Sequence, residues 1–93
     1  MIAPSVKVTV DRERTMCMTW GSNIAFEKAM GLKMSQLDLK ALGMYELAAL
    51  VWSALLKDDP TLTIEQVADM IHPGNQQDVL DAFTRLQEAN AKN

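Results

Sequence analysis

Residues 44–57 have the sequence MYELAALVWSALLK, the strongest helical pattern in the chain. Apolar residues recur there with the spacing of one helix face, and further apolar residues cover most of the remaining surface. A helix that is apolar on nearly all sides must have neighbours on several sides. The segment therefore predicts a central helix around which the rest of the protein packs. Its main face consists of Met44, Leu47, Ala48, Val51, Ala54 and Leu55.

The central helix is expected to end at Asp58-Asp59-Pro60, which is typical of a solvated turn. Thr63 and Gln66 then have the spacing of a capping box, in which each side chain accepts from the other residue's backbone N–H. Apolar residues at helical spacing follow from Ile64 to Ile71. This stretch predicts a second, amphipathic helix.

A third helix is expected after the break at His72-Pro73-Gly74. Asn75 can cap it, and apolar residues with helical spacing extend through residues 76–88. Residues 89–93 are expected to form a frayed tail.

Upstream of the central helix, the first twenty residues have the pattern of a β-hairpin. Apolar β-branched and polar residues alternate over residues 6–10, and a second alternating run covers residues 15–20. The polar stretch at residues 11–14 separates the two runs, as in a hairpin with a longer loop. One face of the second strand would carry Met16, Met18 and Trp20.

Two short helical segments are expected between the hairpin and the central helix. Ser22 can cap a helix over Asn23–Met30, and Gly31 can end it in the left-handed conformation that favours glycine. Residues 32–42 have scattered apolar positions and predict one or two further helical turns before Gly43.

These elements predict a single α+β domain, mainly α, with an N-terminal β-hairpin and a small bundle of three to four helices. Its parts are the hairpin over 1–20, the helical part over 22–88 and the tail over 89–93. The chain has 93 residues, 48% of them hydrophobic, so one folded core is expected. No apolar run reaches the roughly 18 residues of a membrane span, and the N-terminus lacks a signal-peptide pattern.

The charges are distributed unevenly along the chain. Residues 1–40 contain six basic residues (lysine or arginine) and four acidic residues, so their net charge is +2. Residues 41–93 contain three basic and eight acidic residues, so their net charge is −5. An acidic half repels phosphate, so a protein partner is expected and nucleic acid is not.

The sequence contains no cluster of residues with the spacing of a catalytic, cofactor or metal site. His72 is the only histidine and Cys17 the only cysteine, and they are far apart in the chain. The four glycines are scattered, so they form no phosphate-binding loop. We therefore expect no enzymatic activity, no cofactor and no bound metal.

Seven methionines are many for a chain of this length. Methionine is common on surfaces that accept varied apolar partners, although it also fills cores. We interpret the hairpin face and the first helix as the candidate partner-binding surface. The alternative is that the same side chains pack in the core of the domain. The candidate residues are Met16, Met18, Trp20, Phe26 and Met30.

Two functions of other classes remain open. The helices over 63–71 and 76–88 have the order of a helix-turn-helix, so a small DNA-associated regulator is one alternative. The second of these helices has Arg85 as its only cation, which opposes phosphate contact. The other alternative is a homo-oligomeric structural protein whose hairpin edge pairs between copies.

Residues 50–67, LVWSALLKDDPTLTIEQV, resemble the central signature of the tail assembly chaperones of long-tailed bacteriophages and prophages. In that family an apolar helix with a Leu-Trp-Ala-x-Leu pattern precedes a short acidic segment with proline and then Leu-Thr-x-Glu-x-Val. Phe26 to Leu32 is similar to the family's upstream helix, which has an acidic residue before a Gly-Leu pair. In element order the resemblance extends over residues 20–93.

The resemblance implies a non-enzymatic protein that binds and shields the tape measure protein during tail morphogenesis. Tail tube protein is a second implied partner, and self-association is compatible with this role. The implied location is the cytoplasm of the bacterial host, and the protein would be absent from the mature virion.

Overall fold

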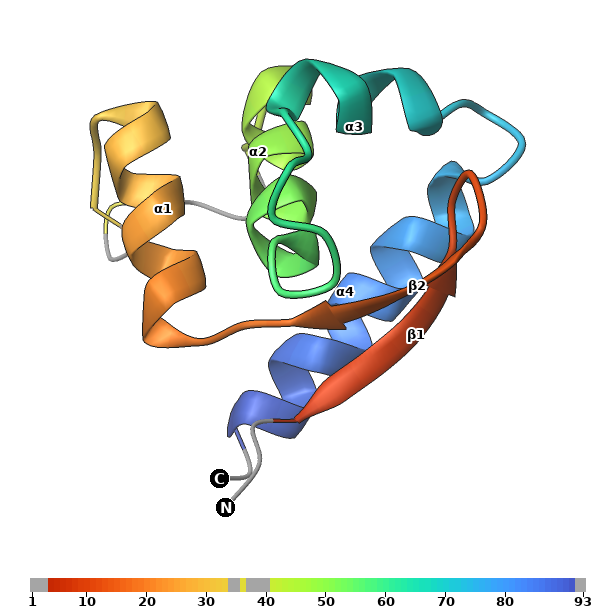
Figure 1. The fold of residues 1–93 in the computed structure, drawn as a ribbon, viewed down its shortest axis with the longest axis horizontal. Coiled ribbons are helices and arrows are strands. Elements are labelled where there is room, and N and C mark those ends of the chain that lie inside the picture. Colours follow the sequence, from red (N-terminus) through yellow and green to blue (C-terminus); the bar gives the residue numbers. More distant parts are fainter. Residues whose placement is uncertain (1–3, 34–35, 37–40, 92–93) are drawn as a thin grey trace.

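In the computed structural model, which describes residues 4–33, 36 and 41–91, the helix α2 (Met44–Leu55) lies between the other elements. Figure 1 shows α1 on one side of α2, and the β-hairpin with α4 on the other. Seven of the twelve residues of α2 are buried. The expectation of a central helix is confirmed, because an element with neighbours on both sides has little surface left for water.

The hairpin consists of β1 (Ser5–Thr9) and β2 (Glu13–Cys17), paired antiparallel from Ser5 opposite Cys17 to Thr9 opposite Glu13. The second strand was expected to continue to Trp20, and that expectation is wrong. The strand ends at Cys17, and Trp20 is the first residue of the helix that follows. The alternating pattern continued past the strand end because Met18 still packs inward without belonging to the sheet.

Helix α1 (Trp20–Met30) is capped by Thr19. The Thr19 hydroxyl accepts from the Ser22 N–H, and the Ser22 hydroxyl accepts from the Thr19 N–H, both at 3.2 Å. Ser22 was expected to be the cap itself; it is instead the third helical residue, where it completes a capping box. Gly31 ends the helix with φ +70°, as predicted. The short helical segment expected over 32–42 lies mostly outside the described residues.

The connection from α2 to α3 (Ile64–Met70) is closely fixed by hydrogen bonds. The predicted capping box is confirmed: Thr63 and Gln66 exchange side-chain bonds with each other's N–H at 2.9 and 3.1 Å. The Trp52 indole N–H donates to the Leu62 carbonyl at 2.9 Å. Helix α2 itself ends at Leu55, two residues before the predicted end.

Helix α4 (Gln76–Ala91) packs against the hairpin, mainly against β1 (Figure 1). Its predicted start is confirmed, whereas the helix continues through residues 89–91 instead of fraying there. The Asn75 carbonyl accepts the first helical bond, from Val79. The Asn75 side chain accepts from the His72 N–H and donates to the Met70 carbonyl, so it fixes the turn from α3.

Two apolar clusters form the core, and α2 contributes to both. One lies between α2, the hairpin, α3 and α4, and the other between α2, α1 and the start of α3. The predicted class is confirmed: a two-stranded antiparallel hairpin is followed by four helices among the described residues, in a mainly helical α+β fold. Within the same residues, no helix has the length and apolar character needed to cross a membrane.

Candidate partner-binding site

The five residues predicted to bind a partner do not form one surface. Met16, Met18 and Phe26 are buried in the two core clusters, which is the alternative role that their sequence pattern left open. Met30 is half-buried against the second cluster. Trp20 alone is fully open to solvent, with 86% of its surface exposed. It leaves the hairpin face because the chain turns into α1 at Thr19.

Trp20 and Ile24 form an exposed apolar pair on α1. They lie one turn apart on the same face of the helix, and both are exposed. A tryptophan buries on the order of 200 Å² when it is covered, so its exposure leaves a considerable apolar area in water. We call these two residues the α1 pair.

A second apolar surface lies at the other side of α2, where the start of that helix meets the end of α3 and the start of α4. The three elements enclose an open groove with a volume of about 220 Å³. Met44 at its mouth is 80% exposed. We call this feature the α2–α3–α4 groove; its lining is Met44, Leu47, Ala48, Val51, Ala68, Ile71, His72, Pro73, Gln76, Val79 and Leu80.

Seven of the eleven residues that line the groove belong to the most acidic part of the chain. Residues 58–84 contain six aspartates and glutamates and neither lysine nor arginine. Four of these acids have basic groups nearby: Asp58 and Asp59 pair with arginines of the hairpin, and Asp78 and Asp81 line a polar hollow with Lys7 and Arg85.

Glu65 and Asp69 are the other two acids of this segment. Both are exposed on α3, and no ion pair of either is seen within the described part of the chain. Glu65 lies one turn before Ala68, which is exposed and lines the groove, and Asp69 lies one turn after Glu65 on the exposed face of α3. The exposed face of α3 beside the groove therefore carries negative charge.

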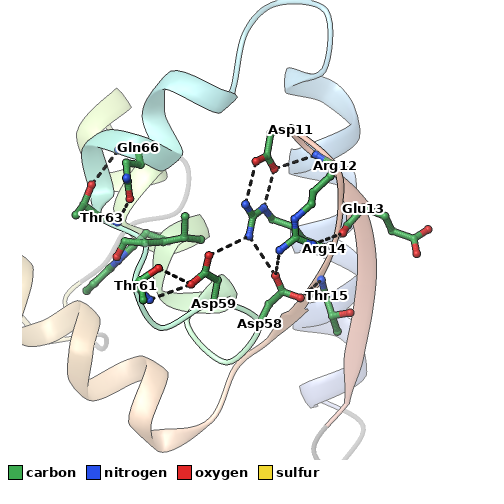
Figure 2. A network of polar contacts seen from close by, with 12 residues as sticks. Asp11, Arg12, Glu13, Arg14, Thr15, Asp58, Asp59, Thr61, Thr63 and Gln66 are labelled. Carbon is green, nitrogen blue, oxygen red and sulfur yellow. Dashed lines mark hydrogen bonds and ion pairs between the residues drawn. The ribbon is translucent and has the colours of Figure 1, made fainter.

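The Arg14 guanidinium joins the hairpin to the turn between α2 and α3, as Figure 2 shows. It donates to both carboxylate oxygens of Asp11, at 2.7 and 2.9 Å, and to Asp58 at 3.2 Å. Asp59 lies 3.7 Å from the same guanidinium. Only 5% of the Arg14 surface is exposed, so these charges interact with little screening by water.

This network shifts the pKa of three of its members. The hydrogen bonds from Arg14 lower the pKa of Asp11 to about 2. The same bonds raise the pKa of Arg14 above its already high ordinary value. The pKa of Asp59 is lowered, first by the Thr61 hydroxyl and N–H that bond to its carboxylate and then by Arg14. All three residues are thus held in their charged forms.

Sequence reasoning missed this network. The acids at 58–59 were interpreted as a solvated turn and residues 11–14 as a polar loop. The Arg14 and Asp58 partners are 44 residues apart, and no local pattern connects them. The only available signal was the presence of opposite charges in two predicted turns.

The described residues contain no group of three or more histidines, cysteines, aspartates or glutamates placed to hold a metal ion. Cys17 is a buried free thiol, and His72 is exposed, with its Nδ1 accepting from the Gly74 N–H at 3.0 Å. Comparisons with protein-family models, with curated proteins and with solved structures give no match.

Proposed function

We propose that the protein is a non-enzymatic tail assembly chaperone that binds and shields a phage tape measure protein. The observation that carries this proposal is the open α2–α3–α4 groove, a concave and mostly apolar surface of the kind at which proteins bind ligands and partners. The sequence resemblance over residues 50–67 supplies the identity of the partner, and the α1 pair provides a second apolar surface on the other side of α2.

The residues that carry the resemblance have clear structural roles. The Trp52 indole N–H donates to the Leu62 carbonyl, Thr63 caps the start of α3, and Asp58 accepts a hydrogen bond from Arg14. Together they set how α3 sits on α2, and these two helices form two walls of the groove. If the motif at residues 50–67 is shared with the chaperones because it fixes α3 on α2, its role is to maintain the shape of the groove and not to supply a catalytic residue.

The task of such a chaperone is to cover apolar surface of its partner. A tape measure protein exposes long amphipathic helices, and their apolar stripes associate with one another unless they are covered. A stoichiometric partner with an open groove covers a stripe without any chemical step. In this role the protein acts in the cytoplasm of the bacterial host, with tail tube protein as a second partner, and it is left out of the mature virion.

The DNA-binding alternative has less support. The exposed polar residues in the first half of α4 are glutamines and aspartates, and a recognition helix of that composition lacks phosphate contacts. Self-association through the hairpin edge or the α1 pair is compatible with the chaperone role and is a separate question.

Co-expression with the tape measure protein of the same phage or prophage tests the proposal. We expect the soluble fraction of the tape measure protein to rise markedly when this chain is present, and the two proteins to co-elute. A tape measure protein that stays insoluble, or that becomes soluble without co-eluting, would refute the proposal. Retention of the chain on DNA, falling with salt, would favour the regulator instead.

A further inference from the structure

The α2–α3–α4 groove has the shape and lining of a site for an apolar side chain. Its volume of about 220 Å³ exceeds the ~150 Å³ of an engineered protein cavity that binds benzene, so a leucine or phenylalanine fits. The groove is open to solvent on the side of Met44 and Ala68, which are both exposed. A helix laid along this opening could insert side chains from one face.

The charge around the groove selects the kind of helix. Glu65 and Asp69 lie on the exposed face of α3 beside the groove, and the three helical stretches that form the walls, residues 44–55, 64–70 and 76–80, contain no lysine or arginine. Acidic residues beside the apolar stripe of a bound helix would be repelled by these carboxylates, whereas lysine or arginine at the same positions would pair with them.

We infer that the groove binds an amphipathic helix of the partner whose apolar stripe is flanked by lysine or arginine. This inference rests on the proposed function, since it specifies which tape measure segments the protein would cover. The α1 helix of a second copy is a less suitable occupant. Its last turns contain one glutamate and one lysine, Glu27 and Lys28, so it has no net charge to match the acidic face of α3.

Two synthetic helical peptides of about 18 residues test this directly, because shorter helices are unstable in water. Both have the same leucine stripe at i, i+3, i+4 and i+7 spacing; one has lysine on the flanks and the other glutamate. We expect the lysine peptide to bind the full-length protein at least about tenfold more tightly in fluorescence anisotropy, and the difference to shrink with salt.

Two substitutions locate the site. Ala68→Gln places a longer, polar and uncharged side chain in the groove opening, and we expect it to weaken binding of the lysine peptide at least about tenfold. Ala29→Gln makes the same change at an exposed position on α1 and should leave binding unchanged. Circular dichroism checks that both variants remain folded, as expected for exposed helix positions.

A third variant tests the charge argument. Neutralising this face of α3 with Glu65→Gln and Asp69→Asn should remove the preference for lysine over glutamate while the leucine stripe still binds. Glu88→Gln, at an exposed position near the end of α4, is the matched control and should keep the preference.

Four results would overturn the inference: no binding of either peptide, equal binding of both, binding that Ala68→Gln leaves intact, or self-association that Ala68→Gln abolishes. The last result would assign the groove to a second copy. Failure of the proposed function is distinguishable, because the tape measure protein would then stay insoluble while the lysine peptide still binds the groove.

Discussion

Among the charged residues that the structure describes, Arg14 is the one whose replacement by methionine should destabilise the protein most. Methionine keeps most of the apolar stem of the side chain but removes the positive charge and the hydrogen bonds to Asp11 and Asp58. The Asp58 side chain is only 18% exposed, so its carboxylate would be left partly desolvated beside Asp59.

The magnitude follows from the burial of the partners. Removing one member of a fully buried ion pair costs about 3–5 kcal/mol. The carboxylates around Arg14 retain some contact with water, Asp11 most of all, so we expect a loss of about 2–3 kcal/mol. For a domain of this size the loss corresponds to a fall in Tm of about 10–20 °C.

Urea and thermal unfolding, followed by circular dichroism, measure this loss. Arg12→Met is the matched control, because Arg12 is 57% exposed and contacts Asp58 at 3.6 Å. We expect that variant to lose less than about 1 kcal/mol. If Arg14→Met were no more destabilising than Arg12→Met, the reasoning about the buried network would be refuted.

Three further predictions concern individual residues. The pKa of Asp11 is lowered from 3.8 to about 2, so between about pH 4 and about pH 2 the unfolded chain binds more protons than the folded chain does. The free energy of unfolding should therefore fall as the pH drops from about 4 to about 2, and it should fall less in Asp11→Asn. Urea unfolding measured at a series of acidic pH values checks this. Trp52→Phe removes the bond to the Leu62 carbonyl and should cost about 1–2 kcal/mol in the same unfolding assay. Trp20→Glu should change stability by less than about 0.5 kcal/mol, because the side chain is exposed, yet reduce co-purification of the tape measure protein.

Each of these has a contradicting result. Equal acid sensitivity of wild type and Asp11→Asn would show that the Arg14 bonds do not set this pH dependence. A Trp52→Phe variant as stable as wild type would mean that the Leu62 carbonyl finds another donor. Unfolding of Trp20→Glu would place Trp20 in the core, and full co-purification would exclude the α1 pair from the interface.

Features encoded within a few residues could be predicted from the sequence. The capping box at Thr63, the glycine end of α1 at Gly31 and the apolar surface of α2 depend on spacings of three or four residues, and all three are confirmed. The sequence predicts the boundary between β2 and α1 less well than it predicts these three features. Thr19 and Ser22 are both good caps, and the choice between them moved Trp20 from a strand to a helix.

Features that depend on chain segments far apart could not be predicted. The Arg14 network joins residues separated by up to 45 positions, and the groove needs three helices in one arrangement. Their residues look like loop charges and ordinary core positions in the sequence. The packing therefore places the candidate site in the α2–α3–α4 groove and not on the predicted surface, which was the hairpin face and the first helix. Of the five predicted residues only Trp20 remains a fully exposed candidate.

The most direct test of the account is a comparison of how much tape measure protein co-purifies with three forms of this chain. We predict that wild type and Ala29→Gln retain equal amounts, whereas Ala68→Gln, equally folded, retains at most about a tenth. Equal retention by all three forms would contradict the claim that the groove is the surface that covers the partner.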